Sequence, residues 1–191
     1  NTNLSGGSLT LGAFNLSTST TSNTNNSRYF ITNGTGALIM TPAAATLRIF
    51  PIGTSTSYDP VSITPTNSVP FAVNVKPTPT NGDFVAPAAI FANVAQRQWD
   101  ITPTGTPGST EIKLTNGGAS YTPTTPVIGH YNGSDWDEIS ATYAANEWTA
   151  TTSTFSPFGA GDQYAFEAPP CTAPSITGQP QATQTVCKNA A

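Results

Sequence analysis

Charged side chains are scarce in this chain of 191 residues. Asp, Glu, Lys and Arg make up 8% of the sequence, against roughly a quarter of an average soluble domain. The six Lys and Arg are scattered singly, and the formal net charge is −4. Nucleic-acid binding needs clustered cations, so the sequence argues against a nucleic-acid partner. No run of about 18 apolar residues occurs either, so we expect no membrane insertion.

The residue types that carry most enzyme and cofactor chemistry are also rare. The chain has one His, one Met and two Cys, which is too few for most metal clusters, haem sites or His-based triads. The sequence offers no nucleophile for which His130 could act as a general base, neither a Gly-x-Ser-x-Gly elbow nor a paired catalytic cysteine. We therefore expect His130 to be structural. The sequence therefore predicts a protein that is not an enzyme and that holds no cofactor.

Proline, glycine, threonine and serine are abundant, with 17 Pro and 16 Gly, while helix-forming residues are few. Short stretches of alternating apolar and polar residues recur at intervals of about ten residues, with proline at most junctions. This pattern predicts an all-β fold, an antiparallel β-sandwich of Greek-key, Ig-like or jelly-roll-like type with an extended N-terminal strand. The strands are expected at 28–32, 37–41, 46–50, 61–64, 71–76, 97–102, 110–115, 126–131, 136–142, 147–154 and 163–168.

The alternation also predicts which side chains form the core. The inward-facing positions are Phe30, Ile31, Leu38, Leu47, Ile49, Phe71, Val73, Trp99, Ile112, Leu114, Val127, Ile128, Trp148, Phe155, Phe158 and Phe166.

Composition divides the chain into three parts. Residues 1–27 carry no charged side chain and are expected to form an N-terminal strand followed by a polar linker. Residues 28–168 are expected to form the sandwich. The Pro-Pro step at 169–170 then opens a segment, 169–191, that is expected to be a linker and the start of an Ig-like unit.

The N-terminal strand is a candidate for assembly. Leu9 and Leu11 alternate with polar residues, as do Phe14 and Leu16 after a shift at Gly12. A strand without charged residues is poorly protected against pairing with another chain. Two interpretations carry equal weight: the strand completes its own sheet, or it joins a neighbouring subunit and builds a filament. If the chain is a segment of a longer stalk, the strand would instead cap a preceding solenoid coil.

Three acidic residues near a predicted turn are a weak candidate for a calcium site. Asp135, Asp137 and Glu138 bring carboxylate oxygens within four positions, and Ca²⁺ takes six to eight oxygen ligands. The alternation of these acids with Trp136 equally suits a plain hairpin with the acids in water, which we favour, so no metal is expected.

Two further pairs of residues have two possible roles each. Tyr131 and Trp136 could form an aromatic platform for surface glycans, although buried aromatic side chains are more common. Cys171 and Cys187 could close a disulfide in an oxidising compartment, and free or separately paired thiols are the alternative.

Several stretches resemble a β-sandwich module of large secreted and surface proteins of the Bacteroidota, exported by the type IX secretion route. The first stretches are 29–36, 47–53 and 58–61, and the others are 97–102, 127–134 with Trp136, and Trp148 with 155–159. Residues 174–180 and 184–187 resemble the opening of the Ig-like repeats that often follow. Residues 6–12 resemble the last coil of the Gly/Thr-rich β-solenoid repeats that often precede such modules. The resemblance implies an extracellular or cell-surface location and use in adhesins, filaments and stalks.

Together these observations predict a structural protein, a building block of a cell-surface filament, stalk or adhesin that assembles through β-strand contacts. Its expected partners are copies of itself or neighbouring modules of a longer chain, with surface glycans as a further candidate. The alternative is a carbohydrate-binding module of a secreted protein that degrades polysaccharides.

Overall fold

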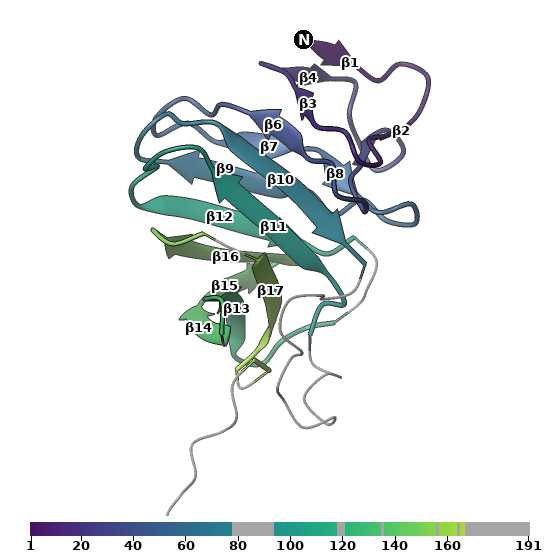
Figure 1. Ribbon diagram of the computed structural model, residues 1–191. Coiled ribbons are helices and arrows are strands. Elements are labelled where there is room, and N and C mark those ends of the chain that lie inside the picture. Colours follow the sequence, from purple (N-terminus) through teal and green to yellow (C-terminus); the bar gives the residue numbers. More distant parts are fainter. Residues whose placement is uncertain (78–93, 118–120, 135, 156, 164, 167–191) are drawn as a thin grey trace, which may run out of the picture.

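The computed structural model describes residues 1–77, 94–117, 121–134, 136–155, 157–163 and 165–166 (Figure 1). Within these residues every regular element is a β-strand, and two large sheets pack face to face. The predicted all-β sandwich is therefore confirmed. The described part contains no helix long and apolar enough to cross a membrane.

The larger sheet has seven strands in the order β14-β13-β17-β11-β10-β6-β3. All neighbours are antiparallel except β3 and β6, which run parallel, so the sheet is mixed. Its strands are β3 (Leu16–Ser17), β6 (Leu38–Met40), β10 (Phe71–Lys76), β11 (Gln98–Pro103), β13 (Pro126–Tyr131), β14 (Trp136–Ser140) and β17 (Pro157–Asp162).

The smaller sheet has five antiparallel strands in the order β15-β16-β12-β9-β7. Its strands are β7 (Arg48–Phe50), β9 (Val61–Pro65), β12 (Thr110–Thr115), β15 (Thr142–Ala144) and β16 (Glu147–Thr152).

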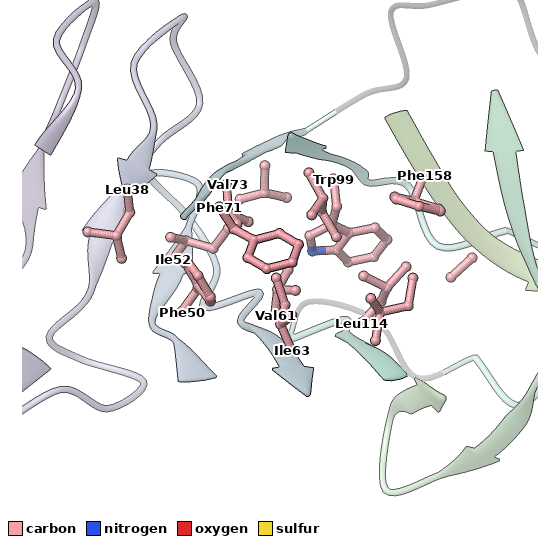
Figure 2. Close-up of a cluster of buried hydrophobic side chains, with 14 of the residues drawn as sticks. Leu38, Phe50, Ile52, Val61, Ile63, Phe71, Val73, Trp99, Leu114 and Phe158 are labelled. Atoms are coloured by element: carbon pink, nitrogen blue, oxygen red, sulfur yellow. The ribbon is translucent and has the colours of Figure 1, made fainter. Parts of the chain in front are cut away.

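The core lies between the two sheets and follows from strict alternation. In β10, Phe71, Val73 and Val75 are buried while the residues between them are partly exposed, and β12 repeats the pattern with Ile112 and Leu114. Figure 2 shows Phe71, Val73 and Leu114 clustered with Trp99 and Phe158, and with Leu38 on the side of the N-terminal strands.

Four predicted core positions differ in the structure. Leu47 and Ile49 are each 48% exposed, so their assignment to the core is wrong. Because β7 lies at the edge of its sheet and turns Phe50 inward, the alternation sends Ile49 outward. Ile31 and Phe155 are only partly buried.

The last predicted strand is also wrong. The strand lies at Pro157–Asp162 instead of 163–168, a range in which residues 164, 167 and 168 lie outside the described residues. Pro157 stands at the first position of β17, where a missing amide donor costs no ladder bond in the strand interior. Phe166 instead packs on the outer face of the large sheet, where a Cβ at Gly129 would collide with its ring.

The N-terminal residues wind into coils. β1 (Thr2–Asn3) pairs in parallel with β4 (Thr21–Ser22), and β2 (Leu9–Thr10) pairs in parallel with β5 (Phe30–Ile31). β5 in turn pairs with β8 (Ile52–Gly53), and β3 pairs with β6. Because Thr2 meets Thr21, Leu9 meets Phe30 and Phe30 meets Ile52, each coil returns above the last after about 20 residues, as in a β-solenoid.

This winding corrects two details of the sequence-based picture. The predicted N-terminal strand is broken into two strands, β2 and β3, at the shift predicted at Gly12, where the chain turns with a φ of 61°. The polar run before residue 28 contains β4 and the corner at Asn25–Arg28, so it is part of the second coil and not a free linker. Gly34 fits directly over the backbone of Gly12, where a Cβ would collide.

Candidate functional site

The strands of the first coil, residues 1–18, are edge strands in every sheet to which they belong. β1, β2 and β3 each stand at an outer position of the strand order, and each pairs with one partner in the second coil. Figure 1 shows this coil at the end of the molecule remote from β13, β14 and β15. In the described part of the chain, the opposite edge of all three strands carries no partner strand.

The hydrogen bonds of β2 show which backbone groups point to that edge. The amide of Leu9 donates to the carbonyl oxygen of Tyr29 at 3.0 Å, and the amide of Leu11 donates to that of Ile31 at 3.0 Å. Since successive amides of a strand point to opposite sides, the amide of Thr10 between them faces away from the second coil.

β3 and β1 repeat this arrangement. The amides of Leu16 and Thr18 donate to the second coil at 2.9 and 3.0 Å, so the amide of Ser17 faces outward. The amides of Thr2 and Leu4 likewise donate to the second coil, which leaves the amide of Asn3 outward. We call the outward backbone of Asn3, Thr10 and Ser17 the first-coil edge. It is a ready template for pairing with another strand.

An apolar stack ends at the same place. In-register parallel pairing puts Ile52, Phe30 and Leu9 on one face, one above another. Ile52 and Phe30 are fully buried, whereas Leu9 is 42% exposed because no residue of the described chain covers it. A further coil placed on the first-coil edge would bury Leu9 as the first coil buries Phe30.

The four residues predicted to form an assembly strand have three different environments. Leu9 and Leu16 lie on strands that pair with their own chain, and Leu11 is buried inside the coils. Phe14 is 80% exposed at a corner. The strands complete their own sheets along one edge and leave the other edge open.

A buried polar network connects the coils to the sandwich. Asp59 is fully buried, and its Oδ2 accepts from Arg97 Nε at 2.9 Å and from the Ser57 hydroxyl, while its Oδ1 accepts from the amide of Gly117 at 2.9 Å. Ser57 contacts the Thr54 hydroxyl at 3.1 Å.

The same network reaches one residue of the second coil. Tyr29 donates its hydroxyl to the carbonyl oxygen of Thr54 at 3.0 Å, and burial, with the charge of Asp59 second, raises the pKa of this tyrosine. Asp59 and Tyr29 therefore belong to one hydrogen-bonded unit that spans the junction. In the sequence, Asp59 and Arg97 lie in stretches of the family resemblance, and Arg97 also in a predicted strand, but no role was predicted for either residue. The signal that could have revealed them is their charge, because charged residues are rare in this chain.

The candidate calcium residues are not brought together. Asp135 lies outside the described residues. Asp137 and Glu138 are successive residues of β14, so their side chains point to opposite faces: Asp137 lies 3.9 Å from His130 Nδ1, and Glu138 accepts from the amide of Phe166. No group of three or more potential metal ligands occurs among the described residues.

The aromatic platform is contradicted at its main residue. Trp136 is 1% exposed, with the rings of Phe166 at 5.4 Å and Tyr131 at 5.5 Å. A sugar ring needs an exposed aromatic face, and Trp136 offers none because Phe166 folds back over it. Tyr131 remains partly exposed beside an open depression that His130 and Phe155 also line.

His130 occupies an inward position of β13. It is buried, its ring lies 5.3 Å from that of Phe158, and its Nε2 has no hydrogen-bond partner among the described residues. Burial lowers the pKa of His130, and nearby Asp137 acts in the opposite direction. The predicted disulfide partners, Cys171 and Cys187, lie outside the described residues.

Comparisons with models of protein families, with curated proteins and with solved structures gave no match.

Proposed function

We propose that this chain is a structural module of an extracellular or cell-surface assembly, a filament, stalk or adhesin, in which the first-coil edge pairs with a β-strand coil of a neighbouring polypeptide. That polypeptide is another copy of the chain or an adjoining module of a longer one. The observation that carries the proposal is the open end of the coils, where three outward amides and the exposed side chain of Leu9 coincide.

Several features support this role over an enzymatic one. The coils add β-structure by parallel, in-register pairing, a geometry in which each new coil repeats the surface it covers. Few charged residues oppose close approach, because residues 1–27 contain none. Pairing with a coil of an adjoining module continues the stack of coils along one axis and gives an extended assembly.

Proline substitution tests the proposal without disturbing the coils. Thr10→Pro with Ser17→Pro removes two outward amide donors but keeps every hydrogen bond to the second coil. The matched control is Asn26→Pro, which adds a proline to the corner of the second coil, away from the edge. We expect sedimentation velocity to show assemblies of the wild type and the control, and monomers of the double variant.

A second experiment tests pairing between modules of one longer polypeptide. Residues 1–19 are duplicated ahead of the chain, so that the added coil can stack on the first-coil edge. We expect the added coil to raise the thermal unfolding temperature, and the two prolines in the acceptor coil to cancel the gain. The proposal fails if the prolines change neither self-association nor the effect of the added coil.

A further inference from the structure

Strand pairing is interrupted between the coils and the smaller sheet. On one side of the molecule the large sheet runs from the sandwich into the coils without interruption, through β10, β6 and β3. On the other side β4 pairs only with β1, and β7 pairs only with β9. An open groove of about 350 Å³ lies between β4 and β7, lined by Thr21, Thr24, Leu47, Arg48, Ile49 and Tyr58.

The groove contains a cation without a counterion. In the described part of the chain, Lys76, Arg97 and Lys113 each have a carboxylate partner, whereas Arg48 and Arg28, which lies outside the groove lining, have none. The Nε of Arg48 is buried and has no hydrogen-bond partner among the described residues. A buried guanidinium donor left unpaired costs free energy that a carboxylate would recover.

The flanks of Arg48 are apolar and exposed. Leu47, which directly precedes β7, and Ile49 within β7 point away from the core, while Arg48 shares the inward face with Phe50. The groove therefore offers a free strand edge, one unpaired cation and two apolar side chains on the opposite face.

We propose that this groove binds an extended segment of a partner polypeptide in which an acidic residue is flanked by two apolar residues. A strand on the free edge of β7 puts the residue opposite Arg48 on the Arg48 face and its two neighbours on the face of Leu47 and Ile49. Charge complementarity selects Asp or Glu for the central position. Thr21 of β4 and Thr24, which follows that strand, line the other wall and supply hydroxyl groups.

The test uses a fluorescein-labelled, C-terminally amidated peptide, Gly-Ser-Thr-Val-Glu-Val-Thr-Ser-Gly, titrated with the whole chain and followed by fluorescence polarisation. We expect saturable binding that weakens about tenfold or more for Arg48→Gln and for a peptide with Gln in place of Glu. The two changes together should cost little more than either alone, because they remove one interaction. Arg28→Gln, which removes a positive charge outside the groove lining, should leave binding unchanged.

The arginine side chains supply a second readout. The chain has three arginines, Arg28, Arg48 and Arg97, so an NMR spectrum of the Nε–H groups separates the groove from its controls. Peptide binding should shift the Arg48 signal. The Arg97 signal, held by Asp59, should stay in place and should report that Arg48→Gln is still folded. Arg48→Lys, which keeps the charge, should retain part of the affinity.

In the titration, the assignment would be overturned by no binding of the Glu peptide up to its solubility limit, by equal binding to Arg48→Gln, or by equal binding of the Gln peptide. In the NMR spectrum, it would be overturned by a shift of the Arg28 signal in place of the Arg48 signal. A peptide with Gln at the centre and a free C-terminal carboxylate that binds as tightly would also overturn it. The first-coil edge is a separate surface, so Thr10→Pro with Ser17→Pro should not affect peptide binding.

Discussion

The sandwich and the first coil bury apolar side chains in different ways. The central strands of the sandwich have six residues and pair antiparallel around a closed core that contains Phe71, Trp99 and Phe158. The strands of the first coil have two residues and pair only in parallel, each with the coil that follows. A closed core is complete by itself, whereas a stack of coils always leaves its last apolar layer exposed. The difference explains why Leu9 is exposed while Phe71 is not.

The largest expected difference between the two regions is in the free energy of unfolding that each loses when one apolar side chain is truncated. Phe71→Ala should lower the free energy of unfolding by about 4 kcal/mol, because it leaves a cavity in the closed core. Leu9→Ala should cost about 1 kcal/mol or less, because much of Leu9 is already in water. Urea denaturation of the monomeric double-proline background measures both, and equal losses would contradict the distinction between the regions.

The Asp59 network tests how the two regions are coupled. Asp59→Asn should cost about 3 kcal/mol, because it removes the fully buried carboxylate that pairs with the partly buried guanidinium of Arg97. Amide exchange should then become faster at Leu9 and Leu11 than at the sandwich strands, since Tyr29 is held by the same network. Glu147→Gln, which removes a partly exposed partner of Lys113, is the control and should cost less than about 1 kcal/mol. A similar loss in both variants would refute the coupling.

The smallest expected effect concerns pH and the sandwich alone. Burial lowers the pKa of His130, so the unfolded chain takes up a proton more readily than the folded chain. Stability from neutral His130 is complete above about pH 6.5 and declines as the pH falls toward the lowered value. The chain has no other histidine, so His130→Gln should remove this part of the decline. Denaturant midpoints between pH 7.5 and 5.5 that fall equally in both proteins would show that His130 is not responsible.

The regular part of the sandwich could be predicted from the sequence. The predicted strands at 71–76, 110–115 and 126–131 coincide with β10, β12 and β13, because strict alternation bounded by turn residues marks a strand with one buried face. β17 was missed because Pro157, Gly159 and Gly161 have low strand propensity, and their suitability depends on neighbours such as Trp148, whose indole donates to Gly161.

The coils and the groove could not be predicted in the same way. A two-residue strand has no periodicity of its own, and its parallel partner lies about 20 residues away, so alternation does not reveal the coils of residues 1–22. In the sequence, only the resemblance of residues 6–12 to a solenoid coil points to them. Which amide of β2 faces outward depends on the pairing register, which sequence alternation alone does not give. Leu47 and Ile49 have the apolar character of core residues, and only their place on an edge strand exposes them.

Amide hydrogen exchange on the assembled protein tests the central claim most directly. The account predicts that Leu9 and Leu11 are protected in both monomer and assembly, because they donate to the second coil. Thr10 and Ser17 should be protected only in the assembly, when a neighbouring coil accepts their outward amides. Rapid exchange of Thr10 and Ser17 in an assembly that is otherwise intact would show that the subunits meet elsewhere and would contradict the account.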